Sequence, residues 1–279
     1  MRRASYDMAG KVVVITGGSS GIGAATAAEV TRRGATVAVL DIDPSTPETV
    51  AARHPSSAIG VVANVTDRAD LDRAMGEVVD RLGRIDVVMA NAGVLARTST
   101  LRNTPPTAID TVFAVNVIGV INTVQAALPH VIDRRGQVVL VSSVFAFLNG
   151  MATIPYAMSK AAIEQLGRGL RVELAMHGVG VTTAYFSLID TPMIQNGLDN
   201  DRTAGDVMKV LPRPLLKRLQ PQSAARAVVD GIEGRATRVV RPARWIPLSA
   251  ARGFINPVLD THLTKSAGLR TLLTELDNR

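Results

Sequence analysis

The chain alternates short runs of β-branched and aliphatic residues with longer segments that have the periodicity of helices. Several runs, such as VVVIT and VVLV, are almost continuously apolar, which is typical of strands covered on both faces. Repeated strand–helix units of this kind predict an α/β fold, with a doubly wound parallel sheet and helices on both faces. The predicted strands are Val12–Thr16, Thr36–Leu40, Ile59–Ala63, Ile85–Ala90, Gln137–Val141 and Val179–Phe186.

Helical periodicity is strongest in segments between and after these strands. They are Gly21–Arg33, Arg68–Leu82, Thr107–Ile132, Pro155–Met176 and Pro221–Ile232. A glycine follows the end of most of them, where a left-handed residue is favoured; these are Gly34, Gly83, Gly136 and Gly178. At this length we expect one domain over residues 1–279. Residues 193–220 form a long segment that we interpret as an irregular substrate lid.

Composition excludes several kinds of chemistry. The chain has no cysteine, which excludes disulfides, thiolate nucleophiles and cysteine-ligated metal centres, and we expect no metal site. Without a signal-like apolar stretch or a run of about 18 apolar residues, we expect a soluble cytoplasmic protein. The formal net charge is +7, and residues 202–279 contain 14 Lys and Arg against 6 Asp and Glu. Because these charges are scattered, we interpret them as a solvated face and expect no binding to nucleic acid.

A glycine-rich segment, TGGSSGIG, directly follows the first predicted strand and opens the first predicted helix. Absent side chains let the backbone approach a pyrophosphate, and the helix N-terminus offers N–H groups to it. A tight strand-to-helix connection would use the same residues, so this segment alone is weak evidence for a nucleotide. The candidate cofactor-binding residues here are Gly17, Ser19, Ser20, Gly21, Ile22 and Gly23.

Asp41 follows the second predicted strand, 18 residues after Gly23. A carboxylate in this place can accept hydrogen bonds from the ribose hydroxyls of adenosine, and it repels a 2′-phosphate. Ser19, Ser20 and Ile42 are uncharged, so the local sequence offers no cation to neutralise that phosphate. We therefore expect NAD rather than NADP; the alternative is that Asp41 only caps the strand end.

Tyr156 and Lys160 lie four residues apart in a predicted helix, which places both side chains on one face. An ammonium beside a phenol favours the phenolate and would lower the tyrosine pKa from its usual value of about 10. This pair alone is common by chance, as a surface tyrosine beside a solvated lysine. Two further residues favour a catalytic role for this pair. Ser143 stands thirteen residues before Tyr156, and Asn116 lies within the predicted helix Thr107–Ile132.

Together with the glycine-rich segment and Asn91-Ala92-Gly93, these residues resemble the short-chain dehydrogenase/reductase family in order and spacing. The resemblance covers roughly residues 9–193. It implies a Rossmann-type fold, a nicotinamide cofactor and a catalytic set of Asn116, Ser143, Tyr156 and Lys160.

The resemblance also implies a role for each member of this set. Tyr156 is the general acid or base, and Ser143 hydrogen-bonds the substrate oxygen. Lys160 binds the nicotinamide ribose and lowers the tyrosine pKa, and Asn116 supports a water that links Lys160 to solvent. Ser142 is a rival to Ser143 that the usual thirteen-residue spacing disfavours.

Further cofactor contacts follow from the resemblance, with two departures from the family pattern. Asn91, Ala92 and Gly93 are expected to line the cofactor cleft, although they would also stabilise the turn there. Asn64-Val65 replaces the Asp-Val that contacts adenine, and an amide can still accept that hydrogen bond. Phe186-Ser187 replaces the usual Pro-Gly, although Ile189 and Thr191 stand where the family contacts the carboxamide and phosphates. Nicotinamide orientation is therefore the less constrained part of the site.

The segments beside the expected reaction centre are apolar. One is VFAFLNGMATIP, before Tyr156, and the lid adds Met193, Ile194, Met208, Val210 and Leu211. We expect an apolar secondary alcohol or ketone, such as a steroid-, terpenoid- or lipid-like molecule. Core packing is the alternative for each residue. The alternative function is a non-catalytic NAD-binding sensor or scaffold, which would need neither Tyr156 nor Lys160.

Residues 245–279 form a basic, amphipathic C-terminal extension. Leu269, Leu272, Leu273 and Leu276 define one apolar helical face within it. We expect a homo-dimer or homo-tetramer in which this face contacts a partner subunit, or else peripheral contact with a membrane surface.

Overall fold

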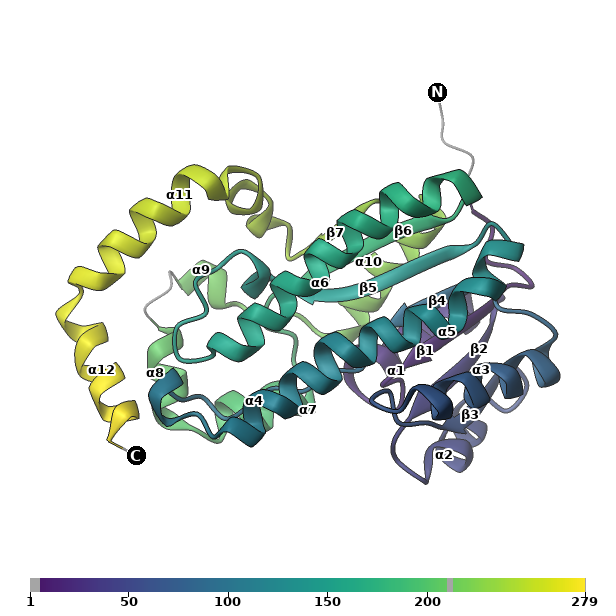
Figure 1. Ribbon diagram of the computed structural model, residues 1–279, viewed down its shortest axis with the longest axis horizontal. Coiled ribbons are helices and arrows are strands. Elements are labelled where there is room, and N and C mark those ends of the chain that lie inside the picture. Colours follow the sequence, from purple (N-terminus) through teal and green to yellow (C-terminus); the bar gives the residue numbers. More distant parts are fainter. Residues whose placement is uncertain (1–5, 210–212, 279) are drawn as a thin grey trace.

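The computed structural model describes residues 6–209 and 213–278, and its centre is a seven-stranded parallel sheet with helices on both faces (Figure 1). The strand order is β3-β2-β1-β4-β5-β6-β7. This confirms the predicted Rossmann-type, doubly wound α/β fold. The strands are β1 (Val12–Thr16), β2 (Thr36–Asp41), β3 (Ala58–Val62), β4 (Val87–Ala90), β5 (Gln137–Ser143), β6 (Gly180–Phe186) and β7 (Arg238–Arg241).

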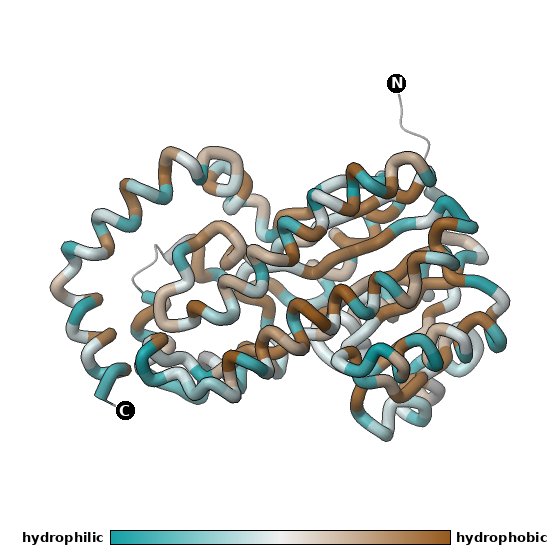
Figure 2. Tube along the Cα trace, viewed as in Figure 1, coloured by the Kyte–Doolittle hydropathy of each residue, from teal (hydrophilic) through white to brown (hydrophobic). Residues whose placement is uncertain are grey.

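Two apolar cores lie on opposite faces of this sheet, which explains the nearly continuous apolar strands. Alternate residues of a strand point to opposite faces, so Val14 joins one core while Val13 joins the other. Figure 2 shows the hydrophobic residues concentrated along the strands. The first core is covered by α3 (Arg68–Leu82), α5 (Gly119–Asp133) and α6 (Ile154–Glu173), the second by α1 (Gly21–Arg32), α2 (Thr46–Arg53) and α10 (Pro221–Glu233).

The predicted helix Thr107–Ile132 is a composite. It consists of α4 (Pro106–Phe113), a π-helical segment (Ala114–Ile118) and α5. This stretch is long and apolar enough to cross a membrane. Among the described residues, no other helix is. In the structure it lies against the sheet, and Val120 and Val124 belong to the first core. We therefore interpret its apolar composition as that of a core helix.

Strand β7 was not predicted from the sequence. Its segment is RVVR, in which Val239 is buried and both arginines are exposed. A four-residue edge strand with charged ends has no apolar run to reveal it, and only its pairing with β6 makes it a strand.

One glycine prediction is wrong. Gly34, Gly83 and Gly178 are left-handed, but beside Gly136 it is Arg135 that has positive φ, at 48°. Gly136 is required for a different reason, because a Cβ there would lie 1.9 Å from the carbonyl oxygen of Asp86.

The expected irregular lid, residues 193–220, is largely helical. It contains most of α7 (Pro192–Ile194), a π-helical segment (Gln195–Asp199), α8 (Arg202–Met208) and α9 (Arg213–Leu216). Asp201 caps α8 by accepting hydrogen bonds from the N–H groups of Thr203 and Ala204. Helices this short have too few residues to establish a periodicity, so the pattern was not recognised. Val210 and Leu211 lie outside the described residues.

The C-terminal extension forms two helices, α11 (Ile246–Lys265) and α12 (Ala267–Asp277), which curve around the lid end of the molecule (Figure 1). The predicted apolar face of α12 exists, but it packs against the same chain: Leu276 lies in a cluster with Ala152 and with Val207 of α8. Assigning this face to a partner subunit or a membrane was therefore wrong, because the lid already covers it.

Candidate active site

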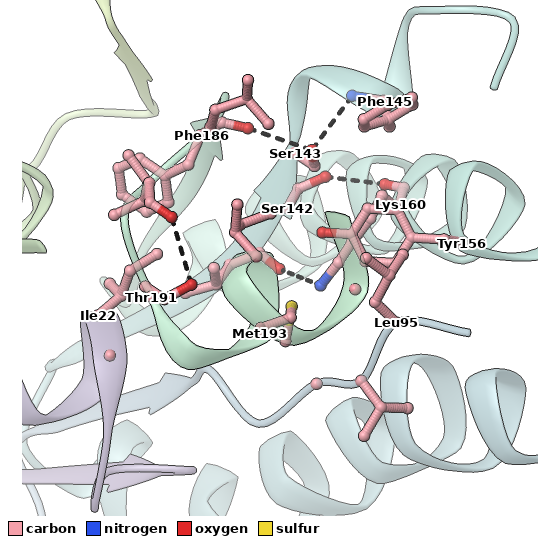
Figure 3. A pocket seen from close by; sticks show the side chains of 18 of the residues that line it. Ile22, Leu95, Ser142, Ser143, Phe145, Tyr156, Lys160, Phe186, Thr191 and Met193 are labelled. Atoms are coloured by element: carbon pink, nitrogen blue, oxygen red, sulfur yellow. Dashed lines mark hydrogen bonds between the residues drawn. The ribbon is translucent and has the colours of Figure 1, made fainter. Parts of the chain in front are cut away.

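The carboxyl ends of the parallel strands form the floor of a cavity of about 420 Å³. The strand order reverses beside β1, which has β2 on one side and β4 on the other. In doubly wound sheets the crevice at this reversal is where ligands bind. Figure 3 shows Ser143, Tyr156 and Lys160 grouped together, with Ile22 and Thr191 on the other side of the view.

The glycine-rich loop between β1 and α1 needs residues without side chains. Gly17 has φ +63°, and a Cβ there would lie 2.7 Å from the Cα of Ala92. A Cβ at Gly23 would lie 2.3 Å from the carbonyl oxygen of Gly17. Asn91 holds the loop by donating hydrogen bonds from Nδ2 to the carbonyls of Thr16 and Gly17, at 3.0 and 2.9 Å. Asn91 thus has the structural role that the sequence left open.

The N-terminus of α1 suits an anion. The side chain of Ser20 makes no capping hydrogen bond, and the first turn contains no acidic residue. The first N–H groups of the helix are therefore available to a phosphate group. Thr191 closes the other side, because a Cβ at Gly21 would lie 3.2 Å from its Cγ2. These features fit the pyrophosphate of a dinucleotide.

Asp41 is held beside the glycine-rich loop, at the end of β2. Its Oδ2 accepts a hydrogen bond from the Ser19 N–H at 3.0 Å, and its Oδ1 accepts one from the Ile42 N–H at 2.9 Å. One cation was missed: Arg53, at the end of α2, donates from Nη1 to the carbonyl oxygen of Ser19 at 2.9 Å. The expectation that no cation lies near this loop is therefore wrong. Arg53 is twelve residues beyond Asp41, and the turn of the chain after β2 brings it back.

The side chain of Asn64 is already engaged. Its Oδ1 accepts hydrogen bonds from both the N–H and the hydroxyl of Thr66, at 3.0 and 2.9 Å. An oxygen with both lone pairs in use is a weaker acceptor for adenine than we expected. Asn64 and Val65 nevertheless line the cavity.

Lys160 is almost fully buried beneath the reaction centre. Its Nζ donates to the carbonyl oxygen of Val141 at 3.1 Å and lies 5.5 Å from the centre of the Tyr156 ring. Burial disfavours the ammonium and lowers the pKa of Lys160 to about 8. Lys160 therefore keeps its charge at neutral pH and loses it in mild alkali.

Tyr156 has a raised pKa, contrary to the lowering we expected from the nearby ammonium. Burial raises it to about 12, and hydrogen bonding with Ser143 offsets only part of this rise. Phe145 packs edge-on against the Tyr156 ring, with centroids 5.9 Å apart. The phenol is therefore protonated at neutral pH, the form that can donate a proton.

The two adjacent serines have different surroundings. Ser142 donates its hydroxyl to the carbonyl oxygen of Lys160 at 2.9 Å, inside the protein. Ser143 donates to the carbonyl of Phe186 at 3.1 Å and accepts from the N–H of Phe145 at 3.2 Å (Figure 3). Of the two, only Ser143 influences the pKa of Tyr156, which it lowers. The geometry thus favours Ser143 over Ser142.

Asn116 lies behind the cavity wall, in the π-helical segment. Its side chain accepts from the N–H of Val94 at 2.8 Å and donates to the carbonyl of Val94 at 2.9 Å and to Ser159 at 3.2 Å. The amide is therefore committed to joining the segment after β4 to α6. The water that Asn116 is expected to support beside Lys160 stays a prediction.

Most of the residues selected from the sequence line this one cavity; Ser19, Gly23 and Asn116 support it from behind. Phe186 and Ser187 also line it, and the Ser187 N–H donates to the carbonyl of Arg241 at 3.1 Å, which extends the pairing with β7. Sequence reasoning missed lining residues outside the expected loop and lid, among them Leu95 and Trp245, whose only signal was apolar character.

Helix α12 fastens the lid over this cavity. Leu276 packs against Val207, which lines the cavity. Asp277 accepts hydrogen bonds from Thr100 at 2.5 Å and from Arg102 at 2.8 Å, so it ties the same helix to the segment after β4.

Leu276→Ala is expected to loosen α12 and with it the lid. Removing a buried leucine side chain costs about 2–5 kcal/mol in well-packed sites, which is enough to detach a terminal helix locally. We expect faster amide hydrogen exchange in α12 and α8, and a KM for an apolar ketone that rises more than kcat falls. Val172→Ala, at an exposed position of α6, is the control. Unchanged exchange and KM would contradict the fastening role.

The fold and this site define a nicotinamide-dependent oxidoreductase. Residues 11–202 match the model of the short chain dehydrogenase family. The chain is 32% identical over 210 residues to 2-(R)-hydroxypropyl-CoM dehydrogenase of Xanthobacter autotrophicus, covering 73% of this chain and 84% of that protein. It is 36% identical over 190 residues to a 3-oxoacyl-(acyl-carrier-protein) reductase of Thermotoga maritima, covering 67% and 77%. The chain therefore belongs to the short-chain dehydrogenase family, whose members transfer a hydride with a nicotinamide cofactor.

Two further similarities bear on the architecture. The structure of levodione reductase superposes with a TM-score of 0.75 at 26% identity, covering 84% of this chain and 96% of that one. The relative named "Probable oxidoreductase EphD" from Mycobacterium tuberculosis is 30% identical over 272 residues, which is 94% of this chain but only 45% of that protein. That similarity extends beyond the family model, into the C-terminal extension.

Proposed function

We propose that this protein transfers a hydride between NAD and an apolar secondary alcohol or ketone, with Tyr156 as the general acid or base. The observation that carries the proposal is the grouping of Ser143, Tyr156 and Lys160 in the cavity that also contains the glycine-rich loop. A sensor that only bound the dinucleotide would need the loop and not this group.

In the reductive direction, NADH held by the glycine-rich loop and Asp41 would supply the hydride to the carbonyl carbon. The Tyr156 hydroxyl donates its proton to the carbonyl oxygen, for which its raised pKa keeps it protonated. Ser143 turns its hydroxyl from the Phe186 carbonyl to the same oxygen and stabilises the developing charge. The Lys160 ammonium favours the phenolate that remains. In oxidation the proton returns to Tyr156.

An uncharged, apolar substrate is supported by the lining of the cavity. Among the described residues that line it, only Asp41 and Lys160 carry charge, and both lie at the proposed cofactor positions. The remaining end is formed by apolar side chains such as Phe145, Leu148 and Trp245. A charged substrate would lose its hydration there without a partner.

Asp41 supports the preference for NAD, and its substitution is expected to change the preferred cofactor. Asp41→Ser removes the acceptor for the ribose hydroxyls, and hydrogen bonds to a charged group contribute about 1.5–3 kcal/mol. We expect the Kd for NADH to rise by about 10- to 100-fold and the Kd for NADPH to fall, with Arg53 contacting the phosphate. Tryptophan fluorescence titration measures both.

The control is Asp41→Ser combined with Arg53→Ala. Compared with Asp41→Ser, the double variant should bind NADPH less tightly and should bind NADH equally weakly. If wild type binds NADPH more tightly than NADH, the preference is reversed and this part of the proposal fails.

The overall proposal is tested by supplying the protein with NADH or NAD and a panel of hydrophobic ketones and secondary alcohols, while following absorbance of the reduced nicotinamide. Turnover of apolar compounds, with charged analogues unreactive, is the expected result. Tight NADH binding without turnover of any compound would favour the sensor.

A further inference from the structure

A second hollow lies directly outside the active-site cavity, between the segment after β4 and the lid. Its volume is about 760 Å³. It opens to solvent, since four polar residues that line it are exposed: Arg97, Asn196, Asn200 and Arg202. The hollow and the cavity share the residues that stand between them, which are Gly93, Val94, Leu95, Met193 and Gly197. A wall only one residue thick therefore separates the apolar cavity from the solvent-filled hollow.

The wall closes where Leu95 meets Gly197. A Cβ at Gly197 would lie 2.8 Å from Cδ2 of Leu95 and 3.6 Å from its Cγ, so the end of the leucine side chain rests on the glycine. Leu95 follows β4 and Gly197 belongs to the π-helical segment of the lid, so this contact joins the two sides of the wall. In the view of Figure 3, Leu95 lies below Tyr156, away from Ser143. Because a leucine side chain changes rotamer without moving the backbone, the contact is able to open and close.

Both sides of this contact are anchored elsewhere. On the lid side, Arg218 binds both carboxylate oxygens of Asp199, the last residue of the π-helical segment. On the other side, Thr100 donates a hydrogen bond to Asp277 of α12 at 2.5 Å. The backbone on either side of the wall is thus held in place, and rotation of the Leu95 side chain is the smallest movement that opens it.

A ternary complex needs a route for the substrate that the cofactor does not block. In the proposed function the dinucleotide extends along the glycine-rich loop from Asp41 towards Lys160 and fills that end of the cavity. Other sides of the cavity are covered: α12 packs on the lid at Val207, and α11 is hydrogen-bonded to the carbonyl of Phe147, in the segment before Tyr156. The wall at Leu95 is where the cavity borders the outer hollow.

We propose that the contact between Leu95 and Gly197 is a gate through which the substrate passes from the outer hollow into the cavity. The side chain at position 95 then limits the width of the molecules that enter, which makes Leu95 a specificity-determining residue. The proposal rests on the proposed function for the identity of the molecule that enters. The gate itself is a property of the wall and can be tested without turnover.

The absence of cysteine from the chain allows a reversible lock to be built across the gate. In Leu95→Cys with Gly197→Cys, one sulfur takes the place of the leucine Cγ, which is 3.6 Å from the second Cβ, and this is near the spacing that a disulfide requires. Turnover of a branched ketone with NADH should be lost on oxidation and return with dithiothreitol. The Kd for NADH should be the same in both forms, because the cofactor lies at the other end of the cavity. Leu95→Cys alone should not respond to oxidation.

Trp245 supplies a readout that needs no turnover. It is the only tryptophan of the chain, it lines the cavity, and it is 1% exposed. Acrylamide, a small neutral quencher, reaches it through the gate when NAD fills the cofactor end. The quenching constant should fall when the double variant is oxidised and should rise in Leu95→Ala. Leu101→Ala is the matched control, because Leu101 lies six residues further along and is 51% exposed, and it should be quenched like wild type.

Three results would overturn the proposal. Failure of the two cysteines to cross-link would show that positions 95 and 197 are not in contact. Equal quenching of the oxidised and reduced double variant would show that small molecules enter elsewhere, and equal quenching of Leu95→Ala and Leu101→Ala would show that Leu95 does not control entry. Quenching that follows the gate, without turnover of any ketone in any form, would refute the proposed function and support the gate.

Discussion

Tyr156→Phe is expected to lower kcat for any ketone that this protein reduces by about 10²- to 10⁴-fold, the usual contribution of a positioned general acid. Phenylalanine keeps the ring and its edge-on contact with Phe145, so only the hydroxyl is lost. The affinity for NADH should stay nearly unchanged. Steady-state kinetics and fluorescence titration measure the two quantities separately.

Tyr6→Phe is the matched control for this variant. Tyr6 is also partly buried, but its hydroxyl has no hydrogen-bond partner, and its ring lies beside Lys11 and Arg235 instead of the cavity. Its kcat should equal that of wild type. An active Tyr156→Phe variant would refute the proton-transfer role, whatever the substrate.

Lys160→Met is expected to remove activity and to stabilise the fold. Loss of a charge positioned at the reaction centre typically lowers kcat by about 10²- to 10³-fold. Burial shifts the pKa of this lysine from 10.5 to about 8, which corresponds to about 3 kcal/mol of unfavourable free energy at neutral pH. Methionine fills similar space without this penalty, so the urea midpoint at pH 7 should rise.

The pH dependence of stability separates this explanation from a packing effect. Between pH 8 and 10.5 the unfolded chain binds a proton at Lys160 that the folded chain has lost, so the free energy of unfolding should rise with pH in this range. The Lys160→Met variant should lack this rise. A variant less stable than wild type at pH 7 would show that the ammonium is satisfied in the folded protein.

Much of the fold follows from local patterns in the chain. The strand Val12–Thr16 was predicted with its observed ends, because a run covered on both faces must be apolar at every position. The edge strand Arg238–Arg241 and the short lid helices were not predicted, because their sequences have no such regular apolar pattern. Their residues become a strand or a helix through pairing or packing with distant segments, which leaves no periodic signal.

The candidate site also has residues that the sequence predicts and residues that only the structure reveals. Spacing together with the family resemblance selected Gly17, Asp41, Ser143, Tyr156 and Lys160, and the structure places all of them around one cavity. Arg53 could not be selected, because its approach to Ser19 depends on how α2 returns along β3.

The sequence by itself determined six of the seven strands, most of the long helices that cover them, the place of the glycine-rich loop and the positions of the serine, tyrosine and lysine. Only the tertiary structure decided their electrostatics, because the pKa values of Tyr156 and Lys160 depend on burial beneath distant segments. It also decided which helix of the C-terminal extension faces outward. Both helices contain apolar residues, and only the packing of α12 on the lid leaves Phe254 and Val258 of α11 exposed.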